Sequence, residues 1–397
     1  MATPSLAMIP SGYKEGKVYS VLPNNGDGDF TFSRGSNATR VNKDGLIETV
    51  TGDTPRLDYT DISCPSLLLE PQSTNLIEYS EDFTTGWSNL INGSGINPVV
   101  TSNQGTSPDG SLNADKVVFD LNGGTEQSDY SLLDYSLSGF SNPHTLDTSI
   151  YLKSSDANDY QVVIYNRGTS PQVITVTNQW QRFSVNGTRS NTTNNFRLGL
   201  FGHNSSNTAS LLLFGAQVEE QSFATSYIPT NGSTATRNAD DCKLDNFGSM
   251  PSNYPITVYG EVLPNELSSD SHAFSLLQNV DTSGSYYLSL ELTSTTDLKI
   301  KRRDADTNDA DTISHTLAVG TPFKFAVCFQ NETDYKYSFD GLSAVSVTTS
   351  DTVTWDYNDV LLGTLRLVSD TGSRNPIKEF RLYDTELTDA ELKKLTT

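Results

Sequence analysis

The chain is short of charged side chains, of cysteine and of methionine. Charged residues make up 19% of its 397 residues, and it contains 3 cysteines and 3 methionines. An average soluble protein has about 25% charged residues, so much of the polar surface has to come from Ser, Thr and Asn. Aromatic residues are plentiful, with 18 Tyr and 17 Phe. Because aromatic and β-branched side chains favour strands while Ser and Asn favour turns, this mixture predicts a β-rich fold.

Positive charge and long apolar runs are scarce as well. Lys and Arg number 26 against 48 Asp and Glu, which gives a formal net charge of −22 at pH 7. Such a chain repels nucleic-acid phosphates and anionic lipids, so we expect no nucleic-acid partner. No apolar run approaches the roughly 18 residues needed for a membrane-spanning helix, so we expect no membrane insertion.

A secretory signal and a disulfide framework are also missing. Residues 1–16 contain neither a basic start nor the apolar stretch of a signal peptide. Cys64, Cys242 and Cys328 are far apart and show no CxxC or Cys/His ligand spacing, so we expect inert, structural thiols. These cysteines fit synthesis in a reducing cytoplasm, whereas the neutral polar composition is typical of extracellular modules. A virion protein, made in the host cytoplasm and released by lysis, satisfies both observations.

Short segments with period-two apolar alternation recur along most of the chain. Phe196, Leu198 and Leu200 alternate with Arg197 and Gly199, and similar alternation is present in residues 146–152, 160–165, 256–262, 323–329 and 335–339. Strands of this length, joined by turn-rich segments and without helical periodicity, predict antiparallel β-sandwiches.

One helix is expected, at the end of the chain. Thr388 and Glu391 have the spacing of a capping box, and Leu392 and Leu395 lie on one face of the helix that would follow. A helix of about two turns is stable only when it is docked on a larger structure. The predicted fold is therefore all-β, with tandem antiparallel β-sandwiches and a short C-terminal helix.

The same patterns divide the chain into three parts. Residues 1–75 are dense in turn signals and are expected to form a leader segment, followed by one sandwich over 76–236 and a second over 237–397. The sequence GSNATR (35–40) recurs as GSTATR (232–237). This echo is either chance in a chain rich in Ser and Thr, or a similar edge element placed ahead of each sandwich.

Three stretches resemble known proteins. Residues 30–50, 55–59 and 64–87 (the last reading CPSLLLEPQSTNLIEYSEDFTTGW) resemble the leader of many bacteriophage virion proteins of the fibre and appendage type. Residues 211–241 are similar to the closing segment of jelly-roll, carbohydrate-binding-like modules in phage tail proteins. Residues 377–395 resemble the last strand and helix of concanavalin A-like (laminin G-type) lectin sandwiches.

The resemblance implies a jelly-roll sandwich over residues 76–236 and a concanavalin A-like sandwich over 237–397. It also implies a structural protein of a bacteriophage virion, a head or tail fibre or decoration subunit, whose leader over 1–75 attaches it to the particle. Its partners would then be other virion proteins of the capsid or tail. Phage fibres are commonly homo-oligomers, often trimers, although no heptad repeat in this chain requires one.

Glycan contacts are expected from tryptophan and its neighbours, because aromatic faces stack on sugar rings while Asn and Asp bond the hydroxyls. Trp355, next to Tyr357 and Asp359, is the candidate for a ligand-facing aromatic residue. Trp87 and Trp180 are expected in the core, since Trp180 stands where the similar modules carry a packing tryptophan.

Asp304, Asp306 and Asn308 occupy the first three ligand positions of an EF-hand loop. Asp309 stands in place of the required glycine and His315 in place of the last glutamate, which excludes an EF-hand. A hairpin tip is the expected structure, with Ca²⁺ as the one cation that these oxygens suit.

Motifs for catalysis are few. The tetrapeptide at 370–373 matches that of aspartic proteases, but such an enzyme needs two carboxylates that share a proton and the sequence has no second copy. The four histidines are isolated, and no nucleotide-binding fingerprint is present. We therefore expect a protein that is not an enzyme and requires no cofactor.

The sequence predicts a virion appendage that projects β-sandwiches and binds host surface glycans. The first alternative is a pair of carbohydrate-binding modules from a polysaccharide-processing system. The second is a depolymerase tailspike, in which two carboxylates would face a groove.

Overall fold

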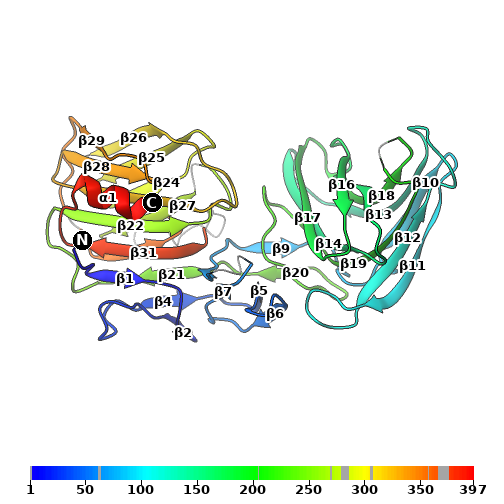
Figure 1. The fold of residues 1–397 in the computed structure, drawn as a ribbon, viewed down its shortest axis with the longest axis horizontal. Coiled ribbons are helices and arrows are strands. Elements are labelled where there is room, and N and C mark those ends of the chain that lie inside the picture. Colours follow the sequence, from blue (N-terminus) through cyan, green and yellow to red (C-terminus); the bar gives the residue numbers. More distant parts are fainter. Residues whose placement is uncertain are drawn as a thin grey trace. The chain divides into compact units, whose positions relative to one another are not determined.

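The computed structural model describes residues 2–60, 64–203, 205–268, 271–278, 286–304, 307–355, 357–364 and 375–397. In this part of the chain nearly all regular structure is antiparallel β-sheet, and the one helix is α1 (Asp389–Thr396; Figure 1). The predicted all-β fold and C-terminal helix are confirmed. Over the same residues no helix has the length and apolarity to span a membrane.

The chain forms two compact units. Unit 1 contains residues 1–43, 50–72 and 238–397, and unit 2 contains residues 44–49 and 73–237.

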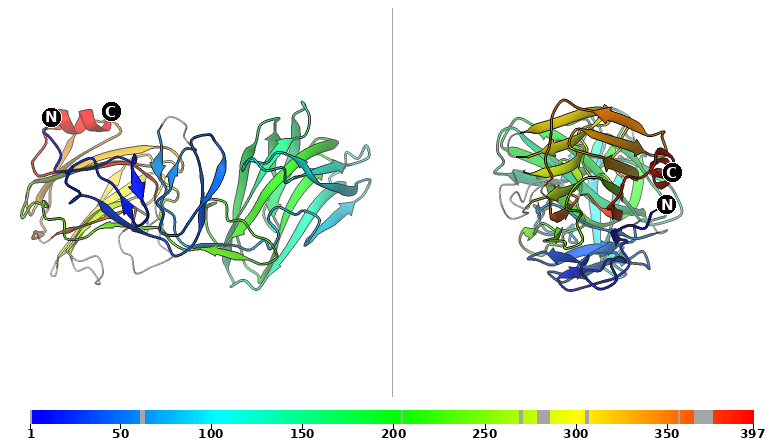
Figure 2. Two further views of the ribbon diagram at one scale, coloured as in Figure 1. Left: turned by 90° about the horizontal axis from the view of Figure 1, so that it is seen from below. Right: turned by 90° about the vertical axis from the view of Figure 1, so that its left-hand side faces the viewer.

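Unit 2 is built on two five-stranded sheets that face each other (Figure 2). The first, here the β13 sheet, has the order β10 (Trp87–Asn92), β13 (Tyr130–Ser138), β18 (Thr193–Phe201), β15 (Tyr160–Asn166), β16 (Gln172–Val176). The second, the β14 sheet, has the order β11 (Ile96–Gly105), β12 (Ala114–Asp120), β19 (Thr208–Glu219), β14 (His144–Ser154), β17 (Gln181–Arg189). Alternate residues of each strand fill the core, as the period-two pattern predicted; Phe196, Leu198 and Leu200 are fully buried there.

Short strands complete unit 2. β9 (Ser73–Asn75) pairs with β20 (Ala235–Arg237). β20 lies within the second copy of the repeated hexapeptide, and the first copy also contains a short strand, β5 (Ala38–Val41) of unit 1. β6 (Ile47–Val50) follows it, and its Ile47 is buried in unit 2 against Phe214 and Tyr227.

Unit 1 also consists of two sheets. The β22 sheet has the order β29 (Val345–Thr348), β28 (Asp334–Phe339), β27 (Phe323–Phe329), β22 (Ile256–Val262), β31 (Ile377–Tyr383), β8 (Ser66–Leu67), β7 (Leu57–Asp58), with β1 (Leu6–Met8) also pairing with β31. The β23 sheet has the order β2 (Tyr13–Lys14), β3 (Lys17–Val18), β4 (Phe30–Ser33), β21 (Asp241–Leu244), β30 (Asp359–Leu362), β23 (His272–Leu277), β24 (Tyr287–Glu291), β25 (Asp297–Arg303), β26 (Asn308–Ser314).

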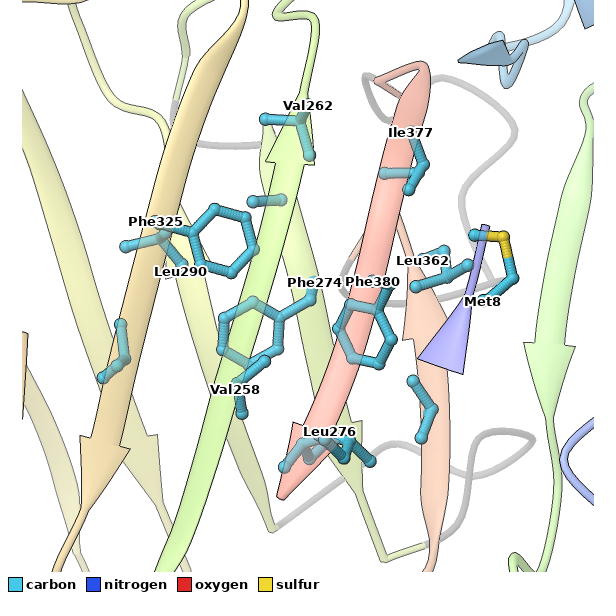
Figure 3. Close-up of a cluster of buried hydrophobic side chains, with 14 of the residues drawn as sticks. Met8, Val258, Val262, Phe274, Leu276, Leu290, Phe325, Leu362, Ile377 and Phe380 are labelled. Atoms are coloured by element: carbon cyan, nitrogen blue, oxygen red, sulfur yellow. The ribbon is translucent and has the colours of Figure 1, made fainter. Parts of the chain in front are cut away.

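Buried side chains of both sheets meet in one core (Figure 3). Phe274 of β23 stacks on Phe325 of β27 with 5.4 Å between ring centroids, and Phe380 of β31 lies 6.1 Å from Phe274. Met8 of β1 joins the same cluster.

The helix α1 covers part of the outer face of the β22 sheet. Thr388 and Glu391 form the predicted capping box, and Leu392 and Leu395 are buried against Tyr259 and Tyr383. The expectation of a short, docked helix is confirmed.

The predicted leader over residues 1–75 is not a separate segment, because residues 1–43 and 50–72 belong to unit 1 and residues 44–49 and 73–75 to unit 2. Strand β1 pairs with β31, with Leu6 opposite Leu382, and β4 pairs with β21, with Phe32 opposite Cys242. The apolar side chains of these short strands are buried in the core of unit 1. Such pairing joins residues hundreds of positions apart, so turn signals in the sequence could not reveal it.

A buried ion network holds these N-terminal strands in unit 1. Asp240 Oδ1 accepts from Arg34 Nη1 at 2.9 Å, and Asp240 Oδ2 accepts from Arg56 and from the Glu70 amide. Arg56 also binds Glu70 Oε2 at 2.9 Å. The guanidinium of Arg34 donates further to the Thr51 carbonyl at 2.7 Å. The network thus joins segments around residues 34, 56, 70 and 240.

Replacing Asp240 tests how much this network contributes to the free energy of unfolding. We expect Asp240→Asn to lower the free energy of unfolding of unit 1 by about 3–5 kcal/mol, because two buried guanidiniums lose their shared counter-charge. The matched control is Asp351→Asn, an exposed position where we expect a change within about 0.5 kcal/mol. Urea denaturation of the full chain measures both. Equal effects of the two substitutions would contradict a structural role for the network.

A buried carboxyl makes the stability of unit 2 depend on pH. Asp147 lies opposite Glu219 in the β14 sheet, and both side chains are buried. Burial raises the pKa of Asp147 from 3.8 to about 7, the Glu219 charge adds to the rise, and Arg182 opposes it. The folded chain therefore holds a proton that the unfolded chain releases between these two values.

It follows that unit 2 loses stability as pH rises through this window, by on the order of 4 kcal/mol from Asp147 alone. We expect Asp147→Asn to remove this contribution, whereas Asp159→Asn, at an exposed position, leaves it intact. Denaturation at about pH 5 and about pH 8 measures the difference for each protein. A pH difference that persists unchanged in Asp147→Asn would show that Asp147 is not its source.

Candidate functional site

The three residues predicted to contact a glycan, Trp355, Tyr357 and Asp359, belong to unit 1. Tyr357 is 4% exposed, and its ring meets the Trp355 ring edge-on with 5.1 Å between centroids. Burial raises the pKa of Tyr357 far above its ordinary value. Asp359 is also buried and accepts a hydrogen bond from the Asn246 amide at 2.7 Å. Tyr357 and Asp359 thus serve packing and a turn, and half-buried Trp355 packs against the core.

Two of the three residues considered for Ca²⁺ lie among the described residues. Asp304 is buried and accepts from the amides of Thr307 and Thr354 at 2.8 and 2.9 Å. Asn308 is exposed at the start of β26, and Asp306 lies outside the described residues. In the described part of the chain no three acidic, His or Cys side chains form a group that could hold a metal ion. The tetrapeptide at 370–373 also lies outside the described residues.

The other two tryptophans lie in unit 2. Trp87 packs in the core 5.2 Å from Tyr135 and 5.3 Å from Phe196. Trp180 is half-buried beside Tyr227 and Phe214, and its Nε1 donates to the Thr106 carbonyl at 3.0 Å. Both act in packing, as predicted.

A different set of residues comes together on the outer surface of the β13 sheet. In a strand, successive side chains point to opposite sides, so the residues between the core positions of β13, β15 and β18 face outward. We call their cluster the aromatic face. It consists of Tyr130, Leu132, Asp134, Val163, Tyr165, Asn195, Arg197 and Phe201.

The aromatic part of this face is continuous. The ring of Phe201 lies 5.6 Å from that of Tyr130 and 6.0 Å from that of Tyr165. Beneath the rings Leu132 and Val163 are fully buried, while Tyr130 and Phe201 are partly exposed. Gly199 separates Leu132 from Val163 in the register and adopts φ +151°, and a Cβ at this position would lie 2.2 Å from the Ser131 carbonyl. Only glycine therefore fits between the two strands.

A polar group flanks the rings. Arg197 Nε donates to Asp134 Oδ1 at 2.5 Å, and Asn195 Nδ2 donates to Asp134 Oδ2 at 2.8 Å. Arg197 Nη1 donates to the Tyr165 hydroxyl at 3.3 Å, and its guanidinium carbon lies 5.8 Å from that ring's centroid. Burial raises the pKa of Tyr165, although Arg197 opposes the rise. The phenol thus stays protonated.

Chemically, the aromatic face offers an apolar surface of rings tilted by 50° to 54° against one another, beside fixed hydrogen-bonding groups. The Asp134–Arg197 pair and the Asn195 amide are locked by their mutual bonds, so little side-chain entropy is lost when a ligand binds. Two exposed serines adjoin this polar group: Ser88 is opposite Asp134 in the register, and Ser136 is opposite Asn195.

The sequence contained a signal for this face in the residues that alternate with the core positions, which the search for apolar alternation did not consider. In a strand with one buried side, the alternate residues face solvent and are normally polar, such as Ser, Thr and Asn. In β13 and β18 they include instead Tyr130, Asp134, Arg197 and Phe201. Large aromatic and charged side chains on the outward-facing positions of two paired strands are therefore visible in the sequence.

Unit 2 also contains a pocket of about 390 Å³. Its lining comes from the segment after β9, from β11 and its following turn, and from the segment before β20: Tyr79, Glu81, Asp82, Asn103, Asn113, Pro229, Thr230 and Asn231. None of these residues belongs to the aromatic face.

Comparison with known proteins gives no family assignment. No family model matches the chain, and no curated protein does. Among solved structures, the CBM40 module of the IT-sialidase of Ruminococcus gnavus bound to α2,3-sialyllactose is similar at 15% identity and a TM-score of 0.32, covering 37% of this chain and 84% of that one.

Two further solved structures are similar to a comparable degree. Domain 4 of AbnA, a GH43 extracellular arabinanase of Geobacillus stearothermophilus in complex with arabinotriose, is 17% identical with a TM-score of 0.32 and covers 45% of this chain and 84% of its own. The heptameric SAP-like pentraxin of Limulus polyphemus is 11% identical with a TM-score of 0.30 and covers 37% and 72%.

Proposed function

We propose that this chain is a non-enzymatic structural protein of a bacteriophage virion, a head or tail fibre or decoration subunit that binds host surface glycans through the aromatic face of unit 2. The observation that carries the glycan-binding part is the juxtaposition, on one sheet surface, of three clustered rings with the Asp134–Arg197 pair and Asn195.

This combination suits a sugar. The apolar face of a pyranose ring packs on aromatic carbon, while its hydroxyls need donors and acceptors at fixed positions. Phe201 and Tyr130 supply the carbon surface, and the free donors of Arg197 supply the polar contacts. Arg197 retains 18% of its side-chain exposure, so a ligand can reach it.

The absence of catalysis is supported by the charges on this face. Glycoside cleavage needs two carboxyl groups at a set separation. The eight residues of the aromatic face include one carboxyl group, that of Asp134, and it forms an ion pair with Arg197. The face therefore has one carboxyl group where glycoside cleavage needs two.

The virion part of the proposal rests on the sequence resemblance of residues 30–50, 55–59, 64–87, 211–241 and 377–395. Capsid or tail proteins would be the partners, with a homo-oligomer, such as a trimer, as the assembled form. Immuno-electron microscopy of particles released from the producing cells tests this part. Label on the particles is expected, and label confined to the soluble fraction would contradict it.

Binding of the full chain to a glycan array tests the glycan-binding part. We expect the wild-type chain to bind a subset of glycans, and the Tyr130→Ala/Phe201→Ala variant to bind them at least tenfold more weakly, because each lost stacking contact removes about 1–3 kcal/mol by analogy with base stacking on aromatic rings. Tyr19→Ala, which removes an exposed ring from unit 1, is the matched control. Thermal unfolding of each variant shows whether the fold is retained.

Two results would overturn this part of the proposal. Undiminished binding by a folded Tyr130→Ala/Phe201→Ala variant would place the glycan elsewhere. Release of oligosaccharides from any bound glycan would contradict the non-enzymatic function and favour a depolymerase.

A further inference from the structure

We propose that the pocket lined by Tyr79, Glu81, Asn113 and Asn231 is a second ligand site, which takes a neutral, hydroxyl-rich molecule of monosaccharide size. Its volume of about 390 Å³ lies at the small end of the range of about 300–1,000 Å³ that is typical of ligand pockets. A ligand of one sugar ring is therefore favoured over a long chain.

A hydrogen-bonded carboxyl group, that of Glu81, lines the pocket. Glu81 Oε1 accepts from the Tyr227 hydroxyl at 2.8 Å, and Oε2 accepts from Asn113 Nδ2 at 2.9 Å. The donated amide leaves Asn113 Oδ1 buried and without a hydrogen-bond partner in the described chain. The two bonds to Glu81 hold its carboxyl group in one orientation, so it presents a fixed acceptor to a ligand hydroxyl.

The rim of the pocket carries uncommitted polar groups. Tyr79, Asn103 and Asn231 line it, and their side chains form no hydrogen bond with another described residue. Together they present a phenol and two amides, which both donate and accept. A polyol matches such a mixed set, because each of its hydroxyls does the same.

Buried polar side chains fix the backbone of two residues that line the pocket, Asn103 and Thr230. Asp115 Oδ1 accepts a hydrogen bond from the backbone N–H of Asn103 at 3.0 Å, and Asp115 Oδ2 accepts one from the backbone N–H of Phe83 at 3.1 Å. Ser80 Oγ bonds the Tyr227 hydroxyl at 2.6 Å and accepts from the Thr230 amide at 2.9 Å. These bonds fix the segments on both sides of the pocket, so the site is preformed.

Charge selects among small ligands. Glu81 and Asp82 are the ionisable acids of the lining, which contains no Lys, Arg or His. An anionic sugar or a phosphate would meet two carboxylates with no counter-charge. A neutral sugar meets no such repulsion.

Ligand-observed NMR on the full chain tests the site. The protein carries the Tyr130→Ala/Phe201→Ala substitutions, so that failure of the aromatic face and failure of the pocket remain distinguishable. The probes are D-glucose, D-galactose, D-mannose and N-acetylglucosamine, with N-acetylneuraminic acid as the anionic probe. We expect saturation-transfer signals from at least one neutral sugar and none from the anionic probe.

Variants then locate the binding. We expect Asn231→Ala and Tyr79→Phe each to weaken the sugar by roughly three- to tenfold, the loss of one hydrogen bond. Asn178→Ala, at an exposed position of the same unit, is the matched control and should leave affinity unchanged.

Three results would overturn the proposal. One is the absence of signal from every neutral sugar, and another is equal affinity in Asn231→Ala, Tyr79→Phe and the control. The third is binding that EDTA abolishes and Ca²⁺ restores, which would assign the pocket to a cation.

Discussion

The carboxylate of Asp240 is the interaction on which unit 1 depends. It pairs with two buried guanidiniums, those of Arg34 and Arg56, and accepts a hydrogen bond from the backbone N–H of Glu70, whose own carboxylate supplies the second negative charge to Arg56. Removing such charges from water is costly, and the cost is offset only when every partner is present. The network therefore makes the N-terminal strands and the strands that follow residue 238 a single cooperative structure. Any attachment role of residues 1–72 belongs to a folded surface, and their removal would damage the sandwich itself.

The two sheets of unit 2 differ in what lies on their outer surfaces. On the β14 sheet, Glu219 is fully buried and accepts from Ser73 and Thr225, and Phe214 packs under Tyr227. Chain segments before and after the strands thus cover the part of this surface around β19, whereas Val118 of β12 is exposed. On the β13 sheet, partly exposed Tyr130 and Phe201 reach solvent. A ligand in solution can therefore contact the aromatic face through these two rings.

Local patterns predicted the strands well, because core and solvent rows alternate within each segment. Phe196, Leu198 and Leu200 are an example, and the capping box at Thr388 is another. The organisation of residues 1–72 could not be predicted, since Leu6 pairs with Leu382 and Arg34 with Asp240, contacts that no local pattern encodes.

The burial of the predicted glycan-binding residues also depends on contacts that no local pattern encodes. Trp355, Tyr357 and Asp359 stand in a polar stretch that is typical of a loop, but Tyr357 is buried by packing against residues distant in sequence, among them Tyr254. The aromatic face arises where β13 and β18 align, with Asp134 opposite Arg197. That register is a tertiary property, although the unusual residues on the solvent rows were visible beforehand.

The central claim is that glycans bind unit 2 on the aromatic face. A crystal structure of the full chain in complex with the glycan that binds best on the array tests it most directly. The account predicts electron density for a sugar ring over Tyr130 and Phe201, within hydrogen-bond distance of Arg197. Sugar density on unit 1 with a vacant aromatic face would contradict it.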